Sequence, residues 1–161
     1  MRTLRLGTRG SRLALIQCEL LVARLRSLGA EVELVQVVTE GDLRPAGMSA
    51  GEGVFVAALE RQLAARKIDL AIHSAKDVPL SLHPDLVIGA YPERADARDV
   101  LVTRTGGGRL ENLAPGSVVG TDSPRRAGFV LSRRPDLSHR PLGGNVDTRL
   151  RKLDRGEADA L

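Results

Sequence analysis

Residues 68–79 read Ile-Asp-Leu-Ala-Ile-His-Ser-Ala-Lys-Asp-Val-Pro, and this stretch decides the predicted fold. Its apolar first half is typical of a short buried strand. Lys76 and Asp77 follow where that strand is expected to end. In open α/β sheets ligands bind outside the carboxyl ends of the strands, so a carboxylate held ionised by a neighbouring cation is a candidate catalytic group there. Taken alone, the pair also fits a solvated surface turn.

Strand and helix patterns alternate on both sides of this stretch, which predicts an α/β fold with a parallel-rich sheet. The glycine-rich segment 40–53 is expected to be a mobile lid or a binding loop, and residues 106–108 a flexible turn. The first helix should bury one apolar face, formed by Leu13, Ile16, Leu20, Ala23 and Leu28. Expected strands cover residues 3–8, 31–39, 68–72, 86–90, 99–103, 117–120 and 138–142, and expected helices cover 11–28, 54–67, 123–133 and 145–153.

Length and a change of composition indicate two small domains. A chain of 161 residues can form one ordinary domain or two small ones. The polar segment 92–98 separates two groups of strand and helix patterns. We therefore expect a first α/β domain over residues 1–95, and a second over residues 96–161 that ends in the start of a further strand.

The charge pattern favours small anionic ligands. The net charge is +4, and only three of the 24 basic residues are lysine. Arginine grips carboxylates and phosphates with a planar fork, although genomic base composition would explain the bias equally well. The few aromatic residues, Phe55, Tyr91 and Phe129, offer no stacking platform for single-stranded nucleic acid. No signal peptide or membrane-spanning run is evident, so a cytoplasmic location is expected, with no nucleic-acid or membrane partner.

Cysteine and histidine usage excludes a metal site and an internal disulfide. The chain has a single cysteine, Cys18, within an apolar helical pattern, where it is expected to be a small buried hydrophobe. The three histidines lack metal-ligand spacing, so no metal is expected.

Three junctions between a strand and a helix share one design, at residues 8–11, 120–126 and 143–149. Each combines small or hydroxyl residues with an arginine near the expected first turn of the helix. A helix start already favours anions, so the arginine is locally unfavourable. One such junction fits an ordinary cap with a solvated arginine, but three together predict anion binding.

At these junctions the chain resembles hydroxymethylbilane synthases, also called porphobilinogen deaminases. The matching segments are Gly7-Thr8-Arg9-Gly10-Ser11, Thr39-Glu40-Gly41-Asp42, Gly53-Val54-Phe55-Val56, His73-Ser74-Ala75-Lys76-Asp77-Val78-Pro79, Gly120-Thr121-Asp122-Ser123-Pro124-Arg125-Arg126 and Leu142-Gly143-Gly144-Asn145-Val146-Asp147-Thr148-Arg149-Leu150. The resemblance implies a monomeric transferase of haem biosynthesis. Such an enzyme joins four porphobilinogen molecules head to tail with loss of ammonia, on a dipyrromethane cofactor bound through a cysteine.

The same resemblance implies a fold and a site. The fold is a periplasmic-binding-protein-like (type II) domain followed by a partial second domain of similar fold. Asp77 matches the catalytic aspartate, which stabilises the cation formed as ammonia leaves. The implied substrate- and cofactor-binding residues are Arg9, Ser11, Lys76, Thr121, Ser123, Arg125, Arg126, Asn145 and Arg149.

Several departures from the family pattern leave a second function open. Glu52 stands where the family's lid usually has lysine, Gly143 replaces an arginine, and Asp122 adds a negative charge beside the implied cofactor site. Family members are about twice as long, so the third domain and its cofactor cysteine are expected to be absent and the chain inactive by itself. The alternative is a non-catalytic module that binds a carboxylate-rich ligand.

Overall fold

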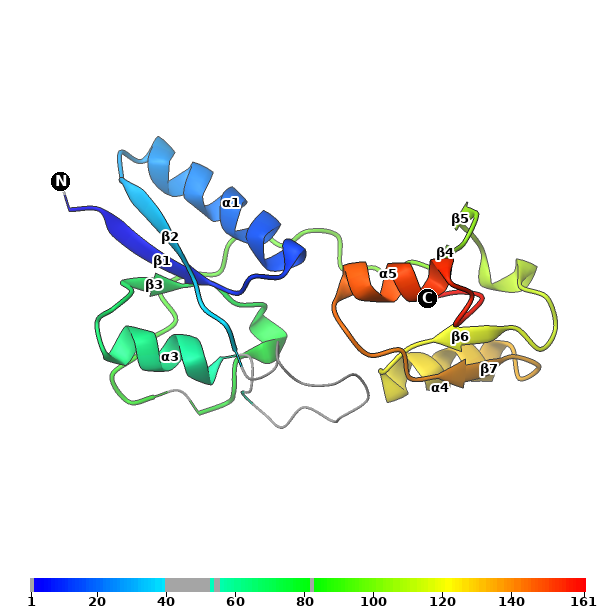
Figure 1. Ribbon diagram of the computed structural model, residues 1–161. Helices are drawn as coiled ribbons and strands as arrows, with labels where there is room; N and C mark the ends of the chain where they lie inside the picture. Colours follow the sequence, from blue (N-terminus) through cyan, green and yellow to red (C-terminus); the bar gives the residue numbers. More distant parts are fainter. Residues whose placement is uncertain (1, 40–52, 54–55, 82) are drawn as a thin grey trace. The chain divides into compact units, whose positions relative to one another are not determined.

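The computed structural model describes residues 2–39, 53, 56–81 and 83–161, which fall into two compact units. The N-terminal unit ends at Glu93 and the C-terminal unit runs from Arg94 to Leu161 (Figure 1). Both units combine helices with parallel strands, as the alternating sequence pattern predicts. The Gly-rich segment expected at residues 40–53 lies almost entirely outside the described residues.

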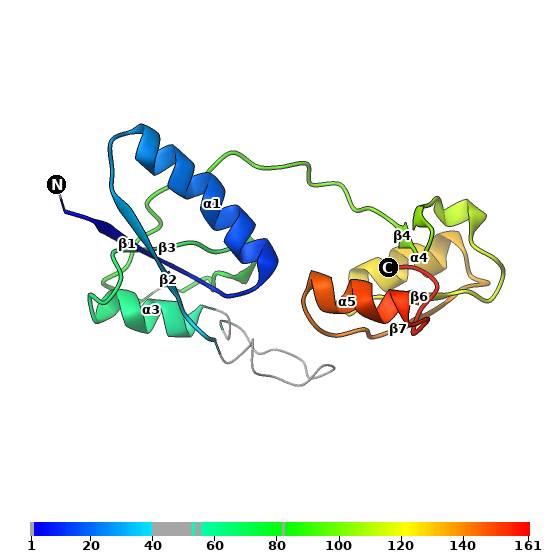
Figure 2. The same ribbon diagram turned by 45° about the horizontal axis from the view of Figure 1, so that its top comes forward.

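The N-terminal unit is built on a parallel sheet with the strand order β2-β1-β3. Strand β1 (Leu4–Thr8) pairs with β2 (Val32–Gln36) and with β3 (Leu70–Ala71). Helix α1 (Arg12–Ser27) lies on one side of these strands and α3 (Ala57–Ala64) on the other (Figures 1 and 2).

Neighbouring residues of β1 face opposite sides of this sheet, because side chains alternate along a strand. Leu6 packs with Cys18, Val22 and Val32 in a core beneath α1. Gly7 faces the other way, and a Cβ atom placed there would lie 2.8 Å from Leu59 on α3. The absence of a side chain at residue 7 therefore lets α3 pack closely on the central strand.

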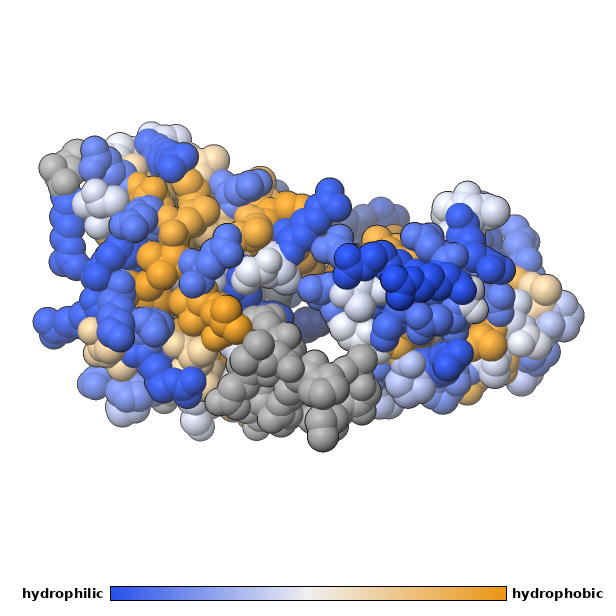
Figure 3. All heavy atoms as spheres, viewed as in Figure 1, coloured by the Kyte–Doolittle hydropathy of each residue, from blue (hydrophilic) through white to orange (hydrophobic). Residues whose placement is uncertain are grey.

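The prediction of the buried face of α1 was wrong. Cys18 and Val22 are the buried residues of this helix, whereas Leu20 is 72% exposed and Leu13 and Ile16 are about half exposed. Figure 3 shows apolar side chains gathered on the surface over α1 and β2. The helix is apolar around most of its circumference, so periodicity alone did not identify the face that meets the sheet.

The C-terminal unit holds two small strand pairs. Strands β4 (Val102–Thr103) and β5 (Gly106–Gly107) are antiparallel, whereas β6 (Val118–Gly120) and β7 (Ser138–Arg140) are parallel. Ala160 forms bridges to Thr103 and to Val119, so the end of the chain joins the two pairs. Helices α4 (Pro124–Arg133) and α5 (Val146–Asp154) follow β6 and β7, and the short 3-10 helix η2 (Leu110–Asn112) follows β5.

Other predicted elements also differ from the structure. Residues 86–90 form no strand in the described part of the chain, and Val87 is 86% exposed. An apolar run indicates that a strand is possible, but pairing requires a neighbouring strand. The glycines predicted as a flexible turn supply β5, and the strand expected over residues 99–103 is confined to β4. Within the described ranges, no helix is long and apolar enough to cross a membrane.

Candidate active site

The carboxyl ends of β1 and β3 bring the first two predicted segments to one edge of the sheet. Gly7 and Ala71 are partners in the parallel register, and the Ile72 amide donates to the Gly7 carbonyl at 3.1 Å. Arg9 and His73 therefore leave the sheet from the same edge. Arg9 and His73, 64 positions apart in the sequence, come to the same edge because β1 and β3 are adjacent and parallel.

Asp77 and Lys76 lie in the short 3-10 helix η1 (Ala75–Asp77), which directly follows this edge. The Asp77 amide donates to the Ser74 carbonyl at 2.9 Å, which fixes the turn. Asp77 is partly buried, whereas Lys76 is exposed. The other predicted hydroxyl of this unit, Ser11, caps α1 by accepting a hydrogen bond from the Ala14 amide at 3.3 Å.

His73 is a further member of this site that sequence reasoning did not assign. Its Nε2 is buried and has no hydrogen-bond partner among the described residues. Burial lowers the pKa of His73, the nearby Arg9 lowers it further, and the Asp77 carboxylate opposes this shift. The net effect lowers the pKa of His73 and so favours its neutral form. Its place immediately after a predicted strand was the available signal.

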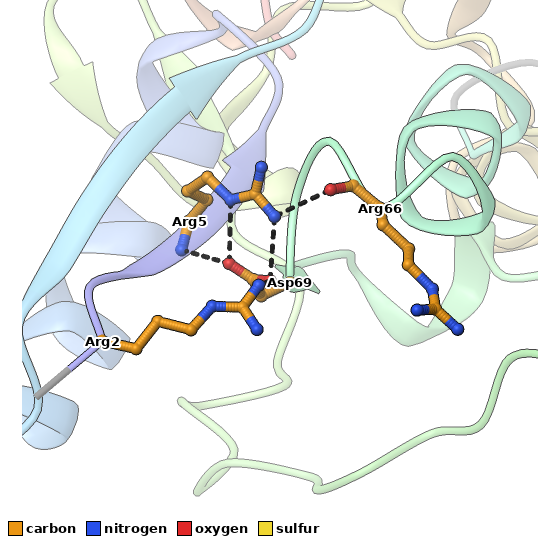
Figure 4. A network of polar contacts seen from close by, with 4 residues as sticks. All are labelled: Arg2, Arg5, Arg66 and Asp69. Carbon is orange, nitrogen blue, oxygen red and sulfur yellow. Dashed lines mark hydrogen bonds and ion pairs between the residues drawn. The ribbon is translucent and has the colours of Figure 1, made fainter.

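An ion-pair cluster stabilises the opposite end of the same strands. Asp69 accepts hydrogen bonds from the Arg5 amide at 2.9 Å and from its Nε and Nη2 at 3.0 Å, while Arg2 Nη2 contacts it at 2.6 Å (Figure 4). Arg5 Nη2 also donates to the carbonyl of Arg66 at 2.7 Å. The bonds from Arg5 hold the pKa of the Asp69 carboxyl well below its usual range. The cluster fixes β3 against β1 and takes no part in the predicted site.

In the C-terminal unit the predicted residues follow the carboxyl ends of β6 and β7. Thr121 is buried, and its Oγ1 accepts a hydrogen bond from the Ser123 amide at 3.2 Å. Ser123 caps α4 by accepting from the Arg126 amide at 3.3 Å, and Pro124 opens the helix. Asn145 caps α5, since its Oδ1 accepts from the Thr148 amide and hydroxyl at 3.2 and 2.9 Å.

Arg125 and Arg126 at the start of α4 share one carboxylate. Arg126 Nη2 donates to Asp99 Oδ1 at 2.7 Å, and Arg125 Nη2 lies 3.9 Å from the other oxygen. The hydrogen bond from Arg126 lowers the pKa of Asp99. Sequence reasoning missed Asp99, because the pairing joins residues 27 positions apart.

Arg149 at the start of α5 is paired with Asp122. Its Nη2 donates to Asp122 Oδ2 at 2.8 Å, and each of the two side chains is about one-third exposed. The Nε of Arg149 is buried and has no hydrogen-bond partner in the described part of the chain. Asp122 therefore neutralises an arginine directly, which is more specific than the general negative charge that the sequence suggested.

The remaining predictions concern glycine, the lid and metals. Gly143 is buried, and its carbonyl accepts a hydrogen bond from Lys152 Nζ at 3.1 Å. Glu52 lies outside the described residues. The described ranges contain no cluster of histidine, cysteine, aspartate or glutamate that could hold a metal ion. Cys18 is fully buried, as expected.

A hollow of about 380 Å³ in the C-terminal unit lies away from the predicted residues. Residues around β4 and β5 line it, together with Arg104 and Asp159, which lie 3.8 Å apart. None of the predicted site residues lines this hollow. The predicted site residues therefore lie near the carboxyl ends of the parallel strands and not in this hollow.

Each unit thus places cationic and carboxylate groups at the carboxyl ends of parallel strands, the edge at which open α/β proteins bind their ligands. Residues 4–161 match the family described as porphobilinogen deaminase, dipyromethane cofactor binding domain. The chain belongs to the porphobilinogen deaminase family.

Similar proteins agree with this membership. The chain is 43% identical to a porphobilinogen deaminase of Exiguobacterium sibiricum, 48% to one of Acidothermus cellulolyticus and 46% to one of Geobacillus kaustophilus. These alignments use all of this chain but 54%, 49% and 53% of the relatives, so the chain spans about half the length of the curated relatives it matches. A solved ancestral cyclohexadienyl dehydratase is similar over 98% of the chain, at 18% identity and a TM-score of 0.38, too low to define the fold.

Proposed function

We propose that this chain supplies the substrate-handling part of a porphobilinogen deaminase, a transferase that joins four porphobilinogen molecules head to tail with loss of ammonia in haem biosynthesis. The observation that carries the proposal is the partly buried Asp77 just beyond the sheet edge where β1 and β3 end, with Arg9 and His73 nearby. Membership of the family and the similarity to porphobilinogen deaminases support it.

Asp77 acts by stabilising positive charge on the pyrrole. When ammonia leaves porphobilinogen, the remaining pyrrole becomes cationic, and a fixed carboxylate beside it lowers the energy of that state. The lowered pKa of His73 suits this role, because a protonated imidazole next to Asp77 would repel the developing cation. Lys76, exposed on η1, is available to the carboxylates of the substrate.

The arginines bind the acidic side chains of the growing product. Each pyrrole carries an acetate and a propionate, so the product gains carboxylates at every step and needs charged donors. Arg9 with Ser11 serves this purpose in the N-terminal unit. In the C-terminal unit the binding residues are Thr121, Ser123, Arg125, Arg126, Asn145 and Arg149.

A dipyrromethane cofactor also fits this donor set. Its acidic side chains require the same donors, and the unpartnered Nε of Arg149 can donate one further hydrogen bond. When bound, the cofactor supplies the pyrrole end on which the product grows. The residues that we expect to hold it are Ser123, Arg125, Arg126 and Arg149.

The proposal includes the architecture of the working enzyme. Residues 1–95 and 96–161 are proposed as two α/β domains of the periplasmic-binding-protein-like type, with the second completed by sequence that the relatives possess. The enzyme is proposed to be a cytoplasmic monomer. The 161-residue chain alone is expected to show no turnover, because the relatives contain about as many residues again.

A non-catalytic module that binds carboxylate-rich ligands is the second candidate. The departures at Glu52 and Gly143 favour it, since both positions lack the basic residue that the family pattern usually has there. Such a module would bind porphobilinogen without consuming it, and replacement of Asp77 would leave its function unchanged.

Porphobilinogen consumption by a chimera separates these candidates. This chain is fused to the part of the Geobacillus kaustophilus relative that it does not cover, and hydroxymethylbilane formation is measured. We expect activity that Asp77→Ala reduces by about 10² to 10³-fold, the usual effect of losing a group that stabilises transition-state charge. Ser74→Ala is the matched control in the same motif and should cost far less. Equal losses in the two variants, or a chimera that binds porphobilinogen without turnover, would favour the binding module.

A further inference from the structure

The Asp122–Arg149 pair uses its guanidinium differently from the Arg5–Asp69 pair. Arg5 grips Asp69 with Nε and Nη2 together, each at 3.0 Å, in the two-point geometry that suits arginine and carboxylate. Arg149 contacts Asp122 through Nη2 alone, at 2.8 Å. Its buried Nε has no partner within the described ranges. The second pair therefore leaves half of the arginine fork unused.

Because the pairing is incomplete, another carboxylate can readily replace Asp122 at Arg149. A buried donor without a partner destabilises the arrangement that contains it, so a partner that reached Nε would be favoured. The side chains of Arg149 and Asp122 are 33% and 32% exposed, so the pair lies at the surface although Nε itself is buried. Ion pairs as exposed as this one contribute little to stability. Displacing Asp122 from Arg149 therefore costs little free energy.

We propose that Asp122 is an internal competitor for the ligand carboxylate at Arg149 and so sets the affinity of this site for carboxylate ligands. In the free chain Asp122 occupies Nη2. An incoming carboxylate takes Nε and Nη2 together, and Asp122 turns toward solvent. This inference rests on the proposed function, because it assigns a regulatory role to one residue of the proposed binding site.

The location of the pair supports competition at the ligand-binding edge. Asp122 lies two residues after the end of β6 and precedes the Ser123 cap of α4, whereas Arg149 is the fourth residue of α5. Both residues thus stand at the carboxyl ends of parallel strands, where ligands of α/β proteins bind. The side chain of Asp122 bonds to Arg149 without capping a helix, so its removal leaves the caps intact.

The test follows the Nε–H signal of Arg149 by ¹⁵N NMR in the 161-residue chain, with the signal assigned through Arg149→Lys. Succinate, a plain dicarboxylate, is titrated at fixed ionic strength into wild type, Asp122→Ser and Asp122→Asn. The control is Asp154→Ser, which removes the same charge at the far end of α5. We expect both Asp122 variants to respond at about two- to fivefold lower succinate than wild type, and Asp154→Ser to match wild type.

Equal midpoints in wild type and the Asp122 variants, or no response of Arg149 in any of them, would overturn the inference. Asp122→Asn provides a conservative second variant should Asp122→Ser fail to fold. A parallel titration with porphobilinogen tests the proposed function separately. A lower succinate midpoint in the Asp122 variants, without any response to porphobilinogen, would support the inference and contradict porphobilinogen as the ligand.

Discussion

Arginine–aspartate pairs lie at the amino ends of the parallel strands in the N-terminal unit and at the carboxyl ends of those in the C-terminal unit, and the two pairs differ. At the amino ends, Asp69 is 17% exposed and bonds to the Arg5 backbone amide, the Arg5 side chain and Arg2. At the carboxyl ends, Asp122 accepts one hydrogen bond from Arg149 and is about one-third exposed. The residue types of an ion pair therefore do not reveal its role. Its role is indicated by the number of hydrogen bonds that it satisfies and by the end of the strand at which it lies.

Removing the two carboxylates should have unequal effects on stability, and this is the largest contrast that we expect. Asp69→Asn keeps the shape but loses the charge that organises Arg2 and Arg5, so it should lower the Tm by several degrees. Asp122→Asn should change the Tm only slightly. Thermal unfolding followed by circular dichroism measures both variants, and equal shifts would remove the distinction between the two ends.

The same comparison has a pH dependence. The pKa of Asp69 is lowered in the folded chain, so its ion pairs stabilise the fold above the ordinary carboxyl pKa of about 3.9 and lose this effect as the pH falls below it. The gap in Tm between wild type and Asp69→Asn should therefore be constant near neutral pH and narrow in acid. A gap that persists unchanged to pH 2 would contradict this assignment.

The close packing beside β1 offers the next largest effect. A Cβ at Gly7 would meet Leu59 at 2.8 Å as well as Ile68, and both of these side chains are buried. Gly7→Ala should therefore destabilise the chain by about 1–3 kcal/mol through overpacking. Gly10→Ala is the matched control, because its nearest neighbour would be Gln36 at 3.6 Å. Urea unfolding of the two variants checks this, and equal midpoints would show that α3 can move.

His73 should produce the smallest of these effects, and only in mild acid. The folded chain binds fewer protons than the unfolded chain because the pKa of His73 is lowered, so stability falls as the pH drops below about 6.5. His73→Gln removes this contribution. Wild type should thus lose more Tm between pH 7.5 and pH 5.5 than the variant loses. A larger loss in the variant would show that His73 is stabilised in its charged form.

Local patterns predicted the elements that carry the proposed chemistry. The caps Ser11 and Ser123 and the junctions at residues 8–11 and 120–126 are defined by neighbouring residues, so the sequence contains them. The buried face of α1 was misjudged because apolar residues surround the helix.

Contacts between residues far apart in the chain could not be predicted from local sequence patterns. The strand expected at residues 86–90 needed a partner that a local pattern does not reveal. The pairing of Asp122 with Arg149 joins residues 27 positions apart, and only the fold brings them together.

The most direct test of the contrast between the two ends is a porphobilinogen titration of the ¹⁵N-labelled chain, with backbone amide shifts mapped onto both units. We expect the shifts to concentrate at the carboxyl ends, around Arg9, residues 73–77, Asp122 and Arg149. The amides of Arg5 and Asp69 should remain unchanged. Shifts centred on Arg5 and Asp69, with none around Asp77 and Arg149, would contradict the account.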